Sequence, residues 1–165
     1  MQIRKLEIKD APLMLEWMHD ESVTRDLKKD FSSLTIEDAK SFIRNSLDDK
    51  ENLNMAIVND EDEYMGTVSL KHIRDGRAEF GIAIRKCAMG KGYSSEAMKQ
   101  ILSYGIDVLG LDSVFWCVDP VNGRAVRFYD KNGYQRVPAD SLNLGQDSGY
   151  SDDEISRFVW YDYTR

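Results

Sequence analysis

Three apolar segments rich in β-branched and aromatic residues follow one another, with only short polar separators between them. The segments are Leu53–Val58, Tyr64–Ile73 and Ala78–Ile84, and the separators contain the sequences NDEDE and RDGR. Short polar separators of this kind are typical of tight turns between strands. The sequence therefore predicts three consecutive antiparallel strands, and this meander limits the folds that the rest of the chain can complete.

A first strand and two helices are predicted ahead of the meander. The segment Gln2–Ile8 alternates apolar residues imperfectly, which suits a short strand. Asp10 is typical of an N-cap, and Pro12 falls early in the helix that would follow it. Thr35 and Asp38 resemble a capping box at the start of a second helix.

Further elements alternate after the meander. A helix is predicted from about Ser94 to Leu109, followed by a strand over Ser113–Asp119. Because a whole helix separates this strand from Ala78–Ile84, the two strands should run parallel. A short helix over Asn122–Gly133 and an aromatic strand over Arg157–Tyr163 complete the pattern. The order β-α-α-β-β-β-α-β-α-β predicts an α/β fold of the α+β type, with a mixed sheet and flanking helices, and not a pure Rossmann winding.

The composition is that of a soluble globular protein. Apolar residues make up 42% and charged residues 31% of the 165 residues, a length that suits a single domain over residues 1–165. The net charge of −7 argues against nucleic-acid binding, and no apolar run is long enough to span a membrane. The N-terminal sequence lacks a signal-peptide pattern, so a cytoplasmic location is expected. Cys87 and Cys117 lie far apart without a histidine cluster, so neither a metal site nor a disulfide is indicated.

Gly90 and Gly92 stand one residue apart between the meander and the next helix. Free N–H groups at such a turn, beside the positive end of a helix dipole, make an anion site, and phosphates are the obvious ligands. A Walker A loop is excluded, because only Lys91 separates the two glycines. The sequence GKGYSS fits a dinucleotide fingerprint only in part, with Ser95 in place of the third glycine. Turn glycines that bind nothing are the alternative.

Two longer segments carry a family resemblance. AMGKGYSSEAM resembles the pyrophosphate loop of the GNAT acetyltransferase superfamily, and VNGRAVRFYDKNGYQRV resembles the second signature of that family. The second signature is complete in this chain, with Asn122, Ala125, Tyr129, Lys131, Gly133 and Tyr134. Cys87 departs from the first signature, because the family usually has Gln or Arg at that position. The resemblance covers residues 64–137 and implies a GNAT-like fold, whose mostly antiparallel sheet contains two splayed parallel strands.

The resemblance implies acetyl-CoA as the cosubstrate, without a metal, and assigns residues to its parts. The pantetheine arm would pair like an added strand with the backbone of the segment made of Ile82, Ala83 and Ile84. Asn122 would hydrogen-bond the same arm. The pyrophosphate would rest on the backbone amides of Met89, Gly90, Lys91, Gly92, Tyr93 and Ser94.

The resemblance also implies direct transfer of the acetyl group to an amine within a ternary complex. Tyr129 would act as general acid for the departing thiolate, and the N–H of Ile82 would stabilise the oxyanion. Glu79 is the candidate general base, because an acid within an otherwise apolar strand is unusual. A surface position on the strand, or pairing with Arg77 or Lys71, is the alternative for Glu79. His72 is the second candidate base.

The expected acceptor is the amine of a small molecule or a peptide. In the family, the first two helices and the C-terminal strands line the acceptor groove, which implies Trp17, Met18, Asp20, Glu21, Arg25, Phe158 and Trp160, with core packing as the alternative for Trp17 and Met18. The segment DSGYSDDE is either a guard for a cationic acceptor or a solvated loop.

The aromatic C-terminal strand is the kind of edge that pairs across a homodimer. A non-catalytic acyl-CoA-binding module and a nucleotide-dependent oxidoreductase are the alternative functions.

Overall fold

A computed structural model describes all residues from Met1 to Arg165, and one seven-stranded sheet runs through it. The strand order is β1-β2-β3-β4-β5-β7-β6, and every neighbouring pair is antiparallel except β4 and β5. The strands are β1 (Gln2–Lys5), β2 (Leu53–Val58), β3 (Tyr64–Arg74), β4 (Arg77–Ile84), β5 (Ser113–Val118), β6 (Arg136–Val137) and β7 (Val159–Thr164). The predicted meander is therefore confirmed as β2, β3 and β4, and so is the parallel pairing of β5 with β4.

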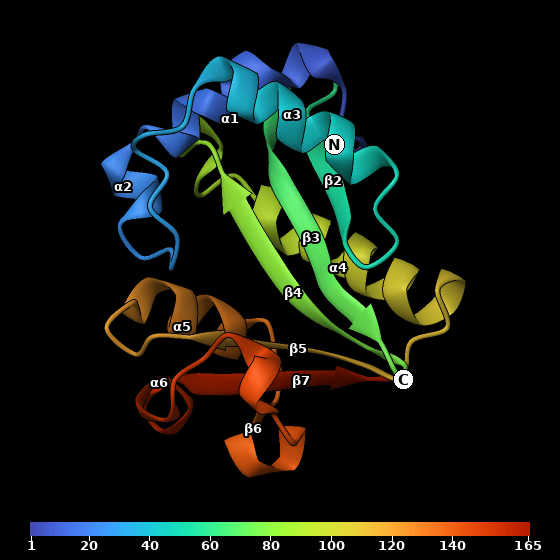
Figure 1. Cartoon of the computed structure of the whole chain (residues 1–165), viewed down its shortest axis with the longest axis vertical. Helices are drawn as coiled ribbons and strands as arrows, with labels where there is room; N and C mark the ends of the chain where they lie inside the picture. Colours follow the sequence, from blue (N-terminus) through green and yellow to red (C-terminus); the bar gives the residue numbers. More distant parts are fainter.

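Helices cover both faces of this sheet (Figure 1). One core joins the apolar side chains of α1 and α3 to β2 and β3, and a second core joins α4 and α5 to β3, β4 and β5. The helices are α1 (Ala11–Met18), α2 (Glu21–Thr24), α3 (Ile36–Leu47), α4 (Tyr93–Ser103), α5 (Gly123–Lys131) and α6 (Asp152–Arg157). None of them combines the length and the apolar character that crossing a bilayer requires.

The strands β4 and β5 stay together over only three residues each. The pairing joins Arg77–Glu79 to Ser113–Phe115, and the two strands separate beyond Glu79. Figure 1 shows them close together near the C-terminus and well apart at their other ends. Because β5 pairs along its whole length with β7 on its other side, the second half of β4 has no neighbouring strand on the side of β5.

The C-terminal strand is not an edge of the sheet, contrary to the premise of the dimer prediction. β7 lies between β5 and β6, with Cys117 paired to Trp160 on one side and Val137 paired to the same residue on the other. The edge strand at this end of the sheet is β6, which has only two residues. Such a short edge offers few free backbone groups to a second chain.

Several element boundaries differ from the sequence prediction. β1 ends at Lys5, and a 3₁₀ turn over Ile8–Asp10 leads into α1. The helix after the glycine turn ends at Ser103 and continues as a single π-helical turn over Tyr104–Val108. The elements α2, α6 and β6 were not predicted, although Ser151 and Glu154 have the spacing of a capping box at the start of α6. The further 3₁₀ turns are Lys86–Ala88, Ala139–Leu142 and Gln146–Ser148.

Two predicted helix starts have different outcomes. Thr35 and Asp38 form the expected capping box of α3. Asp10 precedes α1, but its side chain does not cap that helix. Its carboxylate instead accepts two hydrogen bonds from the Arg4 guanidinium, at 2.8 and 2.9 Å, and one from the Glu7 N–H at 2.8 Å. Asp10 is 2% exposed, so this buried charge depends on these partners.

We expect Asp10→Ala to lower the free energy of unfolding by about 2 kcal/mol, because the change removes three hydrogen bonds to a buried carboxylate and leaves the partly buried Arg4 guanidinium with Asp62 as its remaining hydrogen-bonded carboxylate. Urea denaturation monitored by circular dichroism measures the change. Glu61→Ala removes the same charge at an exposed turn and should shift the free energy of unfolding by less than about 0.5 kcal/mol. Equal effects of the two variants would contradict the importance of the Arg4–Asp10 pair.

Candidate active site

The hydrogen bonds on one side of β4 reveal which of its backbone groups lie on the open side. The N–H of Arg85 donates to the Met65 carbonyl at 2.8 Å, and the direction of hydrogen bonding alternates along a strand. The backbone groups of Ala83 therefore also face β3. Those of Ile82 and Ile84 face the side from which β5 has separated. A ligand that lies alongside β4 can pair with them as an added strand does.

Gly90 and Gly92 give the turn after β4 its shape. Their φ angles are +74° and +85°, which glycine adopts readily, and no protein atom lies within 4 Å of a Cβ built at either position. None of the N–H groups from Gly90 to Ser95 donates a hydrogen bond within the chain, and no side chain caps α4. A row of unpaired N–H groups at the N-terminus of an eleven-residue helix is suited to bind an anion.

Two residues at this turn differ from the predicted set of amides. The N–H of Met89 donates to the Lys86 carbonyl at 3.2 Å and is therefore already paired. The N–H of Ser95, which does not belong to the predicted set, is free. Arg124 on α5 lies beside the same turn, with its Nη1 3.3 Å from the sulfur of Met89. This arginine adds a positive charge next to the unpaired N–H groups.

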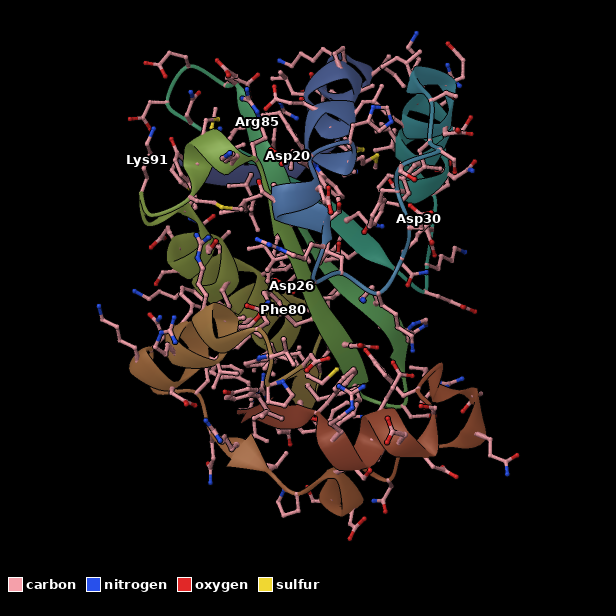
Figure 2. All side chains as sticks on the ribbon, turned by 90° about the vertical axis from the view of Figure 1, so that its left-hand side faces the viewer. Asp20, Asp26, Asp30, Phe80, Arg85 and Lys91 are labelled. Atoms are coloured by element: carbon pink, nitrogen blue, oxygen red, sulfur yellow. The ribbon has the colours of Figure 1, made fainter.

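The glycine turn borders a hollow of about 310 Å³, lined by Met1, Asp60, Lys91, Gly92, Tyr93 and Glu96. Lys91 marks this side of the molecule in Figure 2. The segment that follows α2, with Asp26 and Asp30 labelled, is in the foreground of the same view, and α1 and α3 lie on the other side of the central strands from Lys91. The sheet therefore separates the glycine turn from α1 and α3.

Tyr129 projects from α5 into an aromatic cluster. Its ring centroid lies 5.5 Å from that of Trp116 and 5.1 Å from that of Tyr161. The Tyr129 hydroxyl makes no hydrogen bond within the chain. It is not fully buried either, because the only fully buried side-chain polar atoms without a partner belong to Trp116 and Asp162, so the hydroxyl keeps some contact with solvent. Burial raises the pKa of Tyr129 well above its ordinary value. The phenol is therefore protonated at neutral pH.

Asn122 holds the start of α5. Its side-chain oxygen accepts a hydrogen bond from the Ala125 N–H at 3.1 Å and acts as the N-cap. The side-chain amide nitrogen of Asn122 makes no hydrogen bond within the chain, so it is the part of the side chain that a ligand can use.

Glu79 is the last residue of β4 that pairs with β5, and its side chain is buried. It is 4% exposed, so the alternative of a surface position is wrong, and it forms no ion pair with Arg77 or Lys71. The Tyr150 hydroxyl donates a hydrogen bond to its Oε1. Burial, with the neighbouring Glu79 charge, raises the pKa of Tyr150 far above its ordinary value, so Tyr150 remains a donor. Nothing in the sequence links these two residues, which are 71 positions apart.

A polar cavity of about 330 Å³ borders Glu79 on the side of the 3₁₀ turn Gln146–Ser148, and its lining includes His72, Arg74, Arg77, Phe115 and Asp147. Next to Tyr150, burial raises the pKa of the Cys117 thiol to about 11, so this thiol is protonated at neutral pH. The region around Glu79 thus combines a buried carboxylate, a phenol and an uncharged thiol.

Other predicted site residues have structural roles. Trp17 and Met18 are buried in the core, and the Trp17 N–H donates to the Tyr64 hydroxyl at 2.9 Å. Asp20 caps α2 through the Ser22 N–H. His72, the second candidate base, is exposed on the β3–β4 hairpin.

Comparison with known proteins adds an independent finding. The family model for the GNAT acetyltransferase domain matches residues 1–135. The p20 protein of Bacillus licheniformis, itself an uncharacterized N-acetyltransferase, is 28% identical over 146 residues, which are 82% of this chain and 79% of that protein. The spermidine N(1)-acetyltransferase of Escherichia coli K12 is 36% identical over 80 residues, but these are only 47% of this chain and 43% of that enzyme.

Solved structures share the fold. Spermidine N-acetyltransferase from Vibrio cholerae, in complex with CoA and spermine, aligns with a TM-score of 0.79 at 17% identity, over 99% of this chain and 94% of that one. A GNAT acetyltransferase from Bacillus anthracis aligns with a TM-score of 0.76 at 23% identity, over 98% and 93% of the two chains.

The splayed parallel pair, the unpaired N–H groups at the start of α4 and the family match over residues 1–135 agree with one another. The chain therefore belongs to the GNAT family of N-acetyltransferases.

Proposed function

We propose that this protein transfers the acetyl group of acetyl-CoA directly to the amine of a small molecule or peptide within a ternary complex. The observation that carries the proposal is the continuity of two sets of free backbone groups. The open side of β4 at Ile82 and Ile84 leads through the glycine turn to the unpaired N–H groups of Gly90 to Ser95. A long ligand with an amide-bearing arm and a diphosphate matches both sets.

The residues at this surface fit acetyl-CoA. The pantetheine arm would pair with Ile82 and Ile84, and the amide nitrogen of Asn122 would reach the same arm. The diphosphate would rest on the N–H groups of Gly90, Lys91, Gly92, Tyr93, Ser94 and Ser95, with Arg124 nearby. Acetyl-CoA would supply an activated acyl group, and the protein residues would position it and manage the protons.

Three groups of the chain are candidates for the chemistry. Glu79 would take the proton from the attacking ammonium, directly or through a water, so that the neutral nitrogen forms the new C–N bond. The N–H of Ile82 faces the open side of β4, where it would stabilise the carbonyl oxygen as this oxygen gains negative charge. Tyr129, which its raised pKa keeps protonated at neutral pH, would give its proton to the sulfur as the C–S bond breaks. The second proton that the nitrogen loses as it becomes an amide would go to water, from which the Tyr129 phenolate would recover its own proton.

The two faces of the sheet would divide the substrates. The glycine turn and Tyr129 lie on the α4–α5 side, whereas Glu79 is covered by Tyr150 from the C-terminal segment. The acceptor would approach Glu79 from that second side. A net charge of −7 favours a cationic acceptor over an anionic one, and two of the relatives act on spermidine.

Gly92→Glu should weaken acetyl-CoA binding, because its side chain would project into the space beside the free N–H groups. We expect the affinity measured by isothermal titration calorimetry to fall at least about tenfold. Gly110→Glu is a matched control, since Gly110 also has a positive φ of +71° and open space around a Cβ built there. Gly110→Glu should bind like the wild type. Equal binding by wild type and Gly92→Glu would contradict the assignment of the diphosphate site.

Tyr129→Phe should lower kcat roughly 10²-fold while leaving the KM for acetyl-CoA nearly unchanged. The ring keeps its packing, and the lost hydroxyl makes no hydrogen bond within the chain, so the melting temperature should stay close to that of the wild type. Thiol release followed with a chromogenic disulfide measures the rate. Tyr104→Phe, on the exposed π-helical turn, is the control and should retain full activity. A wild-type kcat for Tyr129→Phe would remove Tyr129 from the mechanism.

Glu79→Gln should lower kcat by a similar roughly 10²-fold near neutral pH, and its rate should then rise steeply with pH. Without the base, the reaction depends on amine that is already neutral in solution, and that fraction grows tenfold for each pH unit below the pKa of the amine. Rates measured from pH 7 to 9.5 test this against the flatter wild-type profile. A parallel pH profile for the two proteins would show that Glu79 does not take the proton.

A further inference from the structure

The ammonium group of Lys28 is held by a cage of three different groups from the C-terminal part of the chain. Its Nζ donates to the Gly149 carbonyl and to Glu154 Oε1 at 3.1 Å, and it lies 4.3 Å from the centre of the Tyr150 ring. A carbonyl, a carboxylate and an aromatic face are the groups with which proteins recognise ammonium ions. We call the Gly149 carbonyl, Tyr150 and Glu154 the ammonium cage.

The cage is held in place without Lys28. Glu154 and Ser151 form a capping box at the start of α6, with Ser151 N–H to Glu154 Oε1 at 3.0 Å and Glu154 N–H to Ser151 Oγ at 3.1 Å. The Tyr150 ring packs edge-on against Trp160, with centroids 5.2 Å apart, and its hydroxyl is bonded to Glu79. These contacts would remain if Lys28 left.

Lys28 reaches the cage across the surface of the protein. It lies in the connection between α2 and α3, and its side chain is 54% exposed. An exposed ion pair contributes little to stability, and a long lysine side chain loses rotamer freedom when it is held. A ligand with an ammonium group can therefore displace Lys28 at low cost.

The position of the cage relative to Glu79 indicates which amino group of an acceptor the cage would hold. The ring of Tyr150 forms one wall of the cage, while the hydroxyl of the same ring contacts Glu79. A cation in the cage is thus separated from the Glu79 carboxylate by the width of the Tyr150 side chain. The cage suits an ammonium at a distance from the reacting nitrogen, and a linear diamine carries two such groups.

We propose that the ammonium cage binds the distal ammonium group of a diamine acceptor, and that Lys28 occupies the cage while the acceptor is absent. This inference rests on the proposed function, because it assumes that the amine which reacts is near Glu79. Lys28 then acts as an internal competitor. The apparent affinity for the acceptor is the intrinsic affinity multiplied by the fraction of molecules in which Lys28 has left the cage.

Calorimetric titration with 1,5-diaminopentane and with pentylamine, without acetyl-CoA, tests the inference. Lys28→Met should bind the diamine roughly three- to tenfold more tightly than the wild type, because the internal competitor is gone. The affinity for pentylamine should change less than about twofold. Lys29→Met is the matched control: it removes the same charge one residue away, where the Nζ lies near Phe31 and outside the cage. Its diamine affinity should equal that of the wild type.

A second variant tests the cage from its other side. Glu154→Gln in the Lys28→Met background should weaken diamine binding at least about fivefold, since the carboxylate is lost. Glutamine also serves in a capping box, so α6 should be kept, and circular dichroism checks this.

Unchanged diamine affinity in Lys28→Met, or equal gains for the diamine and for pentylamine, would overturn the inference. So would an equal gain in Lys29→Met, which would mean a general effect of charge. Because these titrations measure binding alone, they give an answer even if the protein proves to lack acetyl transfer. Loss of transfer with intact cage binding would overturn the proposed function, and intact transfer without cage binding would overturn only this inference.

Discussion

The separation of β4 from β5 after Glu79 is the constraint on which the site depends. A strand in the middle of a sheet normally has both rows of its backbone groups paired, and an unpaired buried row is costly unless water or a ligand satisfies it. This chain leaves an unpaired, half-buried row at Ile82 and Ile84, because β5 pairs with β4 over only three residues and then continues beside β7 alone. The aromatic packing of Trp116 with Tyr129, Tyr134 and Tyr161 holds β5, α5 and β7 together on the far side of the opening. The opening is therefore built into the packing of the sheet.

Much of the fold could be predicted from local sequence. The meander, the glycine turn, the capping box of Thr35 and the helix after Asn122 each depend on residues close together in the chain, and the structure contains them all. Prediction was poorest where the chain has no periodic pattern. The segment between Arg136 and Arg157 forms a two-residue strand, short 3₁₀ turns and α6, and hydrophobic periodicity cannot reveal elements of that length.

The same division applies to the candidate site. The glycine turn follows from a local motif, whereas the backbone groups of Ile82 and Ile84 were expected from the resemblance to the family and not from local sequence. The Glu79–Tyr150 bond and the ammonium cage depend on contacts between distant segments, and no local pattern encodes those. The position of β7 inside the sheet was missed for a similar reason, because strand order depends on the whole chain and not on the aromatic character of one segment.

The glycine turn has a consequence for how the protein tolerates change. Its free N–H groups belong to the main chain, so what they can recognise is determined by the φ angles of Gly90 and Gly92 and not by the identity of Lys91, Tyr93 or Ser94. Cys87 can therefore replace the usual Gln or Arg without removing any of these donors. Alanine substitution at most of these six consecutive residues would leave all the free N–H groups in place. The information that specifies it is carried by two residues that have no side chain.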